Sequence, residues 1–336
     1  MKIDQTANGA ERGYFAVFDG GEGEGSLAGL SAALLRKQRN NWPALADGYA
    51  ALEKSLVKEI DGGNWRVNVQ CNPRRIVSSG AKLDPEAIKK RPCFLCPRNL
   101  PAEQEAILYR KDYNLLCNPA PIFPGHLTIA ARRHIPQELR KNVETLLLLA
   151  DDFGPGTTVF YNGPKAGASA PDHMHFQAAP SGLMPIEEEA FRKWGAAEVK
   201  TINGVAITRT VGLARGVIVV EASQAEALVG VVDRILDIMG SAMADTDGEP
   251  PLNIFCSRVG ESWKLLLCPR IKHRPDAFFC EGDKQIVVSP GAADMGGVVI
   301  APRERDFHRL TAELIADIYR EVAFDDVATE KILSKL

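Results

Sequence analysis

Residues 162–177 read Asn162-Gly163-Pro164-Lys165-Ala166-Gly167-Ala168-Ser169-Ala170-Pro171-Asp172-His173-Met174-His175-Phe176-Gln177, a loop rich in glycine and alanine followed by alternating polar and apolar residues. Side chains alternate between the two faces of a strand, so His173, His175 and Gln177 are predicted to share one face. The apolar residues between them then point to the opposite face, toward a core. The stretch therefore predicts a strand that carries two imidazoles directly after a loop.

The loop and the strand together suit a bound phosphate group. The backbone N–H groups of Gly167 and Ala168 and the hydroxyl of Ser169 can donate to phosphate oxygens, and such fixed donors stabilise developing negative charge. Asn162 and Lys165 are further candidates for substrate contacts.

Each of these features also has an ordinary interpretation. A loop of small residues is often a simple turn, a strand histidine is often hydrogen-bonded or solvated, and a loop lysine is often exposed. The loop is not a Walker loop, because no Gly-Lys-Ser/Thr sequence precedes a helix. This difference disfavours an ordinary kinase or ATPase.

The composition limits the possible partners and compartment. The chain has 336 residues, a net charge of −3 and seven cysteines. This length is sufficient for one large or two medium domains, and the charge gives no sign of a nucleic-acid partner. No uninterrupted apolar run approaches the length of a membrane span. An odd cysteine count without a disulfide framework predicts a reducing cytoplasm.

Three motifs in order resemble the histidine-triad (HIT) superfamily. The first is Gly167-Ala168-Ser169 followed by His-x-His-x-Gln at residues 173–177, with Gln in place of a third His. The second is Asn118-Pro119-Ala120-Pro121-Ile122-Phe123-Pro124-Gly125-His126-Leu127-Thr128-Ile129-Ala130 with Arg132-Arg133-His134, and the third is Cys93-Phe94-Leu95-Cys96. The glutamine points to the branch of galactose-1-phosphate uridylyltransferase, diadenosine tetraphosphate phosphorylase and the GDP-hexose phosphorylases.

The resemblance implies a two-step nucleotidyl transfer. His175 would be the nucleophile that attacks the α-phosphorus of a nucleotide or nucleotide sugar, and Gln177 would donate to a nonbridging phosphate oxygen. Inorganic phosphate or a sugar phosphate would then accept the nucleotide from the histidine. Two other functions stay open at this point: hydrolysis of nucleotide conjugates, and nucleotide binding without catalysis.

A structural zinc site is the second implied feature. Two cysteines separated by two residues match the spacing of a tetrahedral zinc site, but they supply only half of the ligands. By the resemblance, the other ligands to join Cys93 and Cys96 would be His134 and His173. A pair of free thiols or a redox pair is the alternative interpretation.

Contacts to the nucleotide base and to the distal substrate are less defined. Asn72, Arg74 and Arg75 lie in a segment that resembles the family's nucleotide-approaching N-terminal region, although a charged loop after a strand is the ordinary alternative. His126 follows a Pro-Gly turn and is interpreted as structural. Candidates from the second half are Trp263, Lys264, Arg270, Lys272 and His273.

The predicted fold class is α+β, with HIT-like antiparallel sheets and packed helices. We expect an N-terminal helical extension over residues 1–90, a catalytic half over 91–198 and a second, degenerate half over 199–336, with a homodimer as a possibility. Helices are predicted from Ser26 onward, over 42–59, 137–152 and 224–244. Strands are predicted over 65–70, 113–117, 127–131, 157–161, 205–211, 216–221, 252–256 and 264–269.

Overall fold

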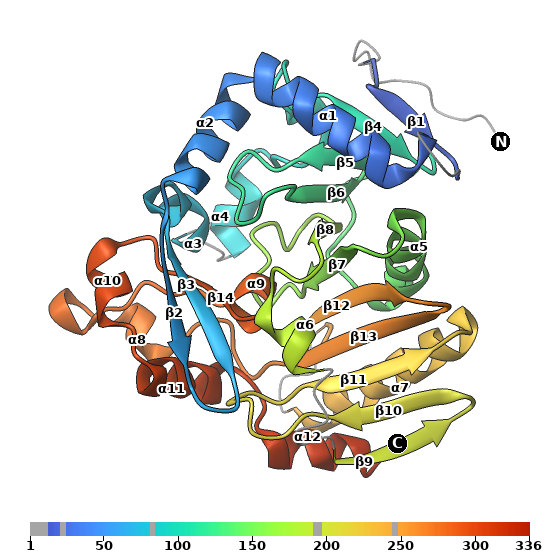
Figure 1. Ribbon diagram of the computed structural model, residues 1–336, viewed down its shortest axis with the longest axis vertical. Helices are drawn as coiled ribbons and strands as arrows, with labels where there is room; N and C mark the ends of the chain where they lie inside the picture. Colours follow the sequence, from blue (N-terminus) through green and yellow to red (C-terminus); the bar gives the residue numbers. More distant parts are fainter. Residues whose placement is uncertain (1–12, 21–24, 81–84, 191–196, 244–247) are drawn as a thin grey trace.

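The computed structural model describes residues 13–20, 25–80, 85–190, 197–243 and 248–336 (Figure 1). Eleven strands within these ranges form one sheet, whose neighbouring strands are antiparallel except for the parallel pair β1 and β4. In spatial order they are β1 (Ala16–Phe18), β4 (Ala106–Tyr109), β5 (Tyr113–Cys117), β6 (Leu127–Ala131), β8 (His175–Pro180), β7 (Thr157–Asn162), β12 (Leu252–Val259), β13 (Ser262–Pro269), β11 (Ile218–Ala222), β10 (Val205–Arg209) and β9 (Ala197–Ile202).

The two halves of the sequence share this sheet. Strand β7 pairs with β12, and the register places Asn162 opposite Asn253 and Phe160 opposite Phe255. On its other side β7 pairs with β8, the strand that carries His175 and Gln177. The end of β7 therefore brings the glycine-rich loop directly against the second half of the chain.

Helices cover one face of the sheet. They are α1 (Leu27–Asn41), α5 (Val143–Phe153) and α7 (Ala225–Ala242). They pack on a core that includes Phe176 and Ala178 of β8 and Met174, the residue directly before this strand. These three side chains are fully buried, as the alternation of the segment predicts.

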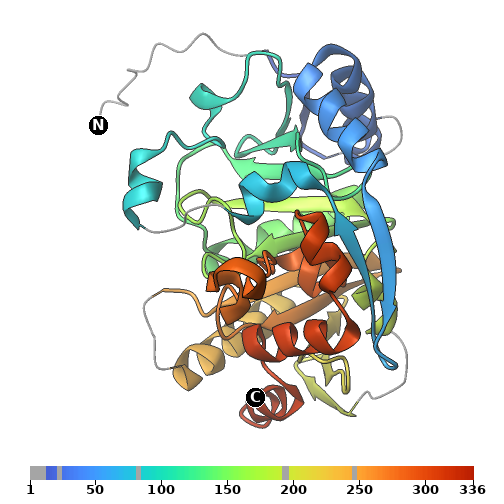
Figure 2. The same ribbon diagram turned by 90° about the vertical axis from the view of Figure 1, so that its left-hand side faces the viewer.

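A second layer covers the other face. It contains a small sheet in the order β14 (Val298–Ile300), β3 (Arg66–Cys71) and β2 (Leu56–Asp61). Helices α6 (Pro185–Glu189), α9 (Ala292–Met295) and α11 (Ala312–Val322) join it in a separate apolar core. Figure 2 shows β2 and β3 running together beside the red C-terminal helices.

The remaining described elements are short. They are α2 (Pro43–Glu53), α3 (Ile76–Ser79), α4 (Pro85–Lys90), α8 (Asp276–Phe279), α10 (Glu304–Arg309), α12 (Asp326–Leu333) and the 3-10 turns η2 (Pro73–Arg75), η3 (Pro97–Asn99), η4 (Arg140–Asn142) and η5 (Gly282–Lys284). Within the described ranges, no helix combines the length and the hydrophobicity that crossing a membrane would require.

The predicted N-terminal helices are partly correct. Ser26 caps α1 by accepting a hydrogen bond from the backbone N–H of Gly29 at 3.1 Å. The helix predicted over 42–59 is wrong beyond Glu53, because residues 56–61 form β2 and pair with β3. The helix predicted over 137–152 begins only at Val143. Three parts of these predictions lie outside the described residues: residues 1–12, the stretch 191–196 before the expected boundary at 198/199, and Ala244. The domain division stays a prediction.

Gly48 in α2 permits close contact with the loop at residues 119–121. A Cβ atom at this position would lie 2.1 Å from the carbonyl oxygen of Pro119. Gly→Ala normally stabilises a helix interior by roughly 0.5–1 kcal/mol. We predict that Gly48→Ala destabilises the protein, because the clash with backbone outweighs this gain. Urea unfolding measures the difference.

The matched control is Gly230→Ala in α7, where no atom lies within 4 Å of the added Cβ. This variant should unfold at the same or a higher urea concentration than the parent chain. Equal effects of the two substitutions would contradict the steric explanation for Gly48.

Candidate active site

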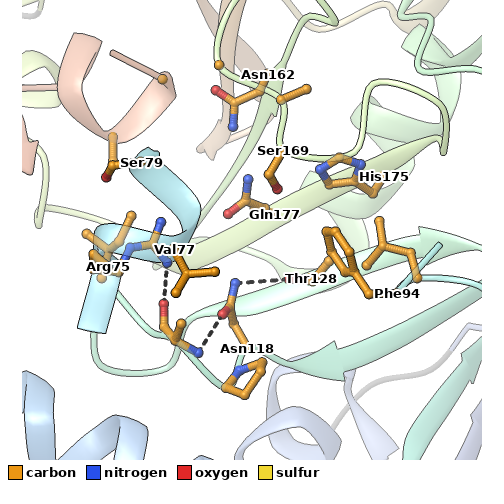
Figure 3. A pocket seen from close by; sticks show the side chains of 18 of the residues that line it. Arg75, Val77, Ser79, Phe94, Asn118, Thr128, Asn162, Ser169, His175 and Gln177 are labelled. Atoms are coloured by element: carbon orange, nitrogen blue, oxygen red, sulfur yellow. Dashed lines mark hydrogen bonds between the residues drawn. The ribbon is translucent and has the colours of Figure 1, made fainter. Parts of the chain in front are cut away.

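A cavity of about 640 Å³ lies between the polar face of β8 and the second layer. Its walls include Ser169, His175 and Gln177 from the loop and strand described above, Arg75 from the N-terminal region, and Arg274 from the second half of the sequence. Figure 3 shows Ser169, Gln177 and His175 close together, with Arg75 on the opposite side of the cavity. The loop and the strand selected from the sequence therefore meet at one site.

The backbone fixes the tautomer of His175. Its Nδ1–H donates to the carbonyl oxygen of His173 at 2.8 Å. The lone pair then resides on Nε2, the nitrogen that remains for chemistry. Burial lowers the pKa of His175 to about 4, so the imidazole is neutral at neutral pH. A neutral imidazole with a fixed Nδ1–H is the form required of a nucleophile.

Gln137 fixes the peptide of His175. Its side-chain Oε1 accepts from the backbone N–H of His175 at 2.7 Å, while its Nε2 donates to the carbonyl oxygens of His175 and Asn162 at 3.0 and 2.9 Å. The glutamine is buried and joins β8 to the end of β7. Sequence reasoning missed this residue, because a lone glutamine near a predicted helix start carries no distinctive signal.

His126 orients the amide of Gln177. The backbone N–H of Ile122 donates to Nδ1 of His126 at 3.1 Å, so the proton of this imidazole is on Nε2. That Nε2–H then donates to Oε1 of Gln177 at 2.7 Å. With its oxygen engaged, Gln177 presents its NH₂ group as the donor to the cavity. Burial is the main cause that lowers the pKa of His126 to about 3, and the positive charge of Arg75 adds to it. The His126 imidazole is therefore neutral at neutral pH.

The glycine-rich loop depends on a close backbone contact. Gly167 has a φ of +98°, and a Cβ there would lie 2.5 Å from the Cα of Gly291. Asn162 holds the start of the loop, since its Oδ1 accepts from the backbone N–H of Ala292 at 2.6 Å. Asn253 also donates to this oxygen, at 2.9 Å, and to the carbonyl of Ala166 at 2.7 Å. Residues of the second half therefore shape the loop.

Ser169 lies at the cavity wall, where Arg91 holds its backbone. The guanidinium of Arg91 donates to the Ser169 carbonyl at 3.1 Å and to Oδ1 of Asp172 at 2.9 Å. Its charge is therefore balanced by Asp172. Gly167 and Ala168 also line the cavity.

Cys93, Cys96, His134 and His173 form a cluster that could hold a metal ion. Their ligand atoms all lie within 4.8 Å of one another. The distance between the two Nδ1 atoms is 3.2 Å, and the closest sulfur to Nδ1 contacts are 3.2 and 3.3 Å. A tetrahedral zinc ion with bonds of about 2.0–2.3 Å would separate its ligand atoms by about 3.3–3.8 Å. The donor set and its spacing therefore fit such an ion.

Outer contacts orient both histidines of this cluster. Nε2–H of His173 donates to the carbonyl of Ala131 at 2.7 Å, which leaves Nδ1 unprotonated and turned toward the cysteines. Nε2 of His134 lies 3.6 Å from Oδ2 of Asp172. A carbonyl or carboxylate behind each imidazole is typical of metal-binding histidines.

Several predicted contacts lie elsewhere. Asn72 is buried and caps the η2 turn by accepting from the backbone N–H of Arg74 at 3.1 Å. Both residues line a separate hollow of about 340 Å³, where Arg74 pairs with Asp47 at 3.4 Å. Lys165 is not among the described residues that line the main cavity. Their substrate contacts stay predictions without geometric support.

The candidates from the second half also differ in position. His273 lines the cavity, and so does Arg274, a residue that belongs to no motif and was therefore not predicted. Trp263 instead donates its indole N–H to the carbonyl of Leu147 at 2.9 Å, and Lys264 lies 3.8 Å from Glu221. Arg270 is fully buried behind the cavity wall.

The fold is similar to that of solved phosphorylase structures, as the resemblance in the sequence motifs implies. A crystal structure of yeast Ap4A phosphorylase in complex with AMP aligns with a TM-score of 0.54 and 14% identity, over 87% of this chain and 97% of that chain. A second structure of the yeast enzyme gives a TM-score of 0.51 and 14% identity, over 85% and 94%.

Other comparisons give more distant or less specific matches. Residues 34–180 match the model of a domain of unknown function, DUF4922. An ADP-glucose phosphorylase from Arabidopsis thaliana with bound ADP-glucose aligns with a TM-score of 0.37 and 16% identity, over 81% of this chain and 100% of that chain. A search of curated proteins finds no significant match.

We predict that the purified chain binds about one zinc ion at the Cys2His2 cluster. Cys96→Ser should reduce the zinc content severalfold and lower the melting temperature, because a structural metal contributes directly to folding. Elemental analysis by mass spectrometry and thermal unfolding measure the two effects. Cys280→Ser, a change at a cysteine outside the cluster, should alter neither. Equal zinc content in both variants would contradict this site.

Proposed function

We propose that this chain is a nucleotidyltransferase of the phosphorylase type that uses His175 as its nucleophile. Its donor would be a nucleotide sugar or a dinucleoside polyphosphate, and its acceptor inorganic phosphate or a sugar phosphate. The observation that carries the proposal is the hydrogen bond from Nδ1–H of His175 to the His173 carbonyl. This bond leaves the lone pair on Nε2, and His175 borders a cavity that phosphate-compatible donors also line.

The reaction proceeds in two balanced steps. In the first, Nε2 of His175 attacks the α-phosphorus, a P–N bond forms, and the bond to the bridging oxygen breaks with its electron pair on the leaving phosphate. The nucleotidyl-imidazolium keeps its Nδ1–H on the His173 carbonyl, whose dipole stabilises the new positive charge. In the second, an acceptor oxygen attacks phosphorus, the P–N bond breaks, and neutral His175 is restored.

Fixed donors would stabilise the negative charge that develops on the nonbridging oxygens. Gln177 offers its NH₂ group, because His126 occupies its oxygen. Ser169 and the loop backbone at Gly167 and Ala168 border the same cavity. Removing one donor of this kind typically costs about 3–4 kcal/mol in the activation free energy.

The amide of Gln177 also limits the leaving group. An amide is not a proton donor of useful acidity, so it cannot protonate a basic leaving group as an imidazolium would. A leaving group that departs as an anion, such as a sugar phosphate or a nucleoside polyphosphate, does not require that proton. This argument favours transfer between phosphates over hydrolysis of phosphoramidates or of other basic conjugates.

The fold comparison supports the same class of substrate. The yeast relative of similar fold is an Ap4A phosphorylase, and one of its structures contains AMP. In the present chain an apolar part of the cavity wall, with Phe94, Leu95, Leu116 and Pro101, would suit a nucleoside. Phe94 is 47% exposed, which leaves ring surface available for stacking on a base.

The zinc ion would have a structural role in this proposal. Cys93, Cys96, His134 and His173 would hold it, and when bound it would fix the segment that precedes β8 rather than take part in phosphoryl chemistry. The cysteines are free thiols, which suits the expected reducing cytoplasm. The homodimer and the location stay predictions.

The experiment is incubation with donors that carry ³²P at the α-phosphate, from a panel of nucleotide sugars and dinucleoside polyphosphates. We expect a base-stable, acid-labile protein adduct with at least one donor, and product formation that depends on added phosphate. His175→Ala should abolish the adduct and reduce turnover on the order of 10³-fold or more, because the nucleophile is lost.

The control is His308→Ala, at an exposed histidine in α10 that lies near Glu304. It should retain the adduct and full turnover. Product formed without an added acceptor would instead identify a hydrolase. Absence of both adduct and turnover across the panel would overturn the enzymatic function.

A further inference from the structure

Arg75 carries a positive charge into the cavity wall without full hydrogen bonding. Its Nη1 donates to the carbonyl of Ala120 at 2.6 Å. Its Nε is buried and has no hydrogen-bond partner within the described part of the chain. Burial lowers the pKa of Arg75 to about 10, which reflects the cost of removing a guanidinium from water. An anion in the cavity would offset this cost.

Arg274, from the second half, lies on the same wall. Its Nε donates to Oγ of Ser289 at 2.8 Å, and its Nη2 donates to the carbonyl of Ser79 at 3.1 Å. Ser79 ends α3, the short helix that begins directly after Arg75. The two guanidiniums therefore approach the cavity from neighbouring positions, although they are about two hundred residues apart in sequence.

Three arginines and one carboxyl group are among the described residues that line the cavity. Arg91, a third guanidinium at the cavity, is paired with Asp172. Among the described residues that line the cavity, Asp294 supplies the carboxyl group, and its oxygens accept from the backbone N–H groups of Ile300 and Gly291. Burial raises the pKa of Asp294 to about 6, so this carboxyl is still mostly ionised at neutral pH and carries one negative charge. Arg75 and Arg274 therefore line the same cavity as this one carboxylate.

The wall that contains Arg75 lies across the cavity from His175. In Figure 3, Arg75 and Ser79 lie on one side of the cavity, His175 lies on the other, and Gln177 lies between them. A phosphorus atom held at His175 and Gln177 would therefore direct its departing phosphate toward the arginines. The cavity of about 640 Å³ is in the range that accommodates a nucleotide-sized ligand.

We propose that Arg75 and Arg274 form one binding site that holds two phosphate groups in turn. The first is the phosphate that leaves in the first step, and the other is the acceptor phosphate that attacks in the second step. The role of this site in the reaction rests on the proposed function. In the first step, the departing phosphate takes the electron pair of the broken P–O bond, and the arginines receive the added negative charge. In the second, they hold inorganic phosphate while its oxygen attacks and the P–N bond breaks.

A binding experiment tests the site independently of turnover. Inorganic phosphate and pyrophosphate are titrated by calorimetry into the full-length His175→Ala protein, which cannot form the histidine adduct. We expect Arg75→Gln and Arg274→Gln, each combined with His175→Ala, to weaken anion binding about tenfold or more. Arg75→Lys should retain part of the affinity, because it keeps the charge but loses the planar donor pair.

Arg74→Gln is the matched control, since Arg74 adjoins Arg75 in sequence but lines the separate hollow and pairs with Asp47. It should leave anion binding unchanged. Thermal unfolding of each variant establishes that the fold persists. Absence of anion binding in the parent protein, or equal losses for Arg74→Gln and Arg75→Gln, would overturn the site.

A kinetic experiment distinguishes a free acceptor phosphate from the distal phosphate of the donor. The nucleotidyl-enzyme is formed with labelled donor and then challenged with inorganic phosphate or with buffer alone. Arg274→Gln should slow discharge by phosphate about tenfold or more and leave the slower discharge by water unchanged. A loss confined to adduct formation would assign the arginines to the donor phosphate alone and overturn the acceptor role.

The two hypotheses can fail separately. If no adduct forms with any donor but the two arginines still govern anion binding, the anion site stands and the proposed transferase function falls. If the adduct forms and phosphate discharges it equally well in the parent, Arg75→Gln and Arg274→Gln proteins, the function stands and this site falls.

Discussion

The arrangement of the active site depends on one buried cation. Arg270 is fully buried, and its guanidinium donates to Oδ1 of Asn253 at 2.7 Å. Its other donors reach backbone carbonyls, those of Val322, Pro290, Lys272 and His273. Five hydrogen bonds satisfy all five N–H groups, which is the condition under which a buried charge is tolerated. Removing the guanidinium would leave several strands and turns without their common donor.

This constraint explains how the second half, which lacks a His-x-His pair, helps to shape the candidate active site. Asn253, oriented by Arg270, donates to Asn162 and to the Ala166 carbonyl, which fixes the loop that would receive the phosphate. The same guanidinium holds the backbone directly before Arg274 and at Pro290, next to the glycine that Gly167 contacts. The phosphate loop of one half and the basic wall of the other are therefore positioned by a single buried group.

The sequence predicted the parts of the site that follow from local patterns. Strand alternation places Phe176 in the core and His175 at the cavity, and the third motif brings Cys93 to the metal cluster. It failed where pairing is non-local: residues 56–61 have helical neighbours, but their backbone hydrogen bonds go to β3. It also could not rank Arg74 against Arg75, because two adjacent arginines look alike in a sequence; the structure places both at the smaller hollow and only Arg75 at the main cavity as well.

The contacts of His173 and His175 give a physical reason for the spacing of these two histidines. His173 turns its ring to the cysteines, while its carbonyl accepts the Nδ1–H of His175. A metal ion in the cluster would therefore hold the residue whose backbone sets the tautomer of His175, the proposed nucleophile, without touching the phosphorus that His175 would attack. Gln137 secures the same peptide from the other side. Because two independent supports fix this short segment, a chain could lose its metal and still keep an imidazole aligned, provided that the glutamine and the strand pairing remain.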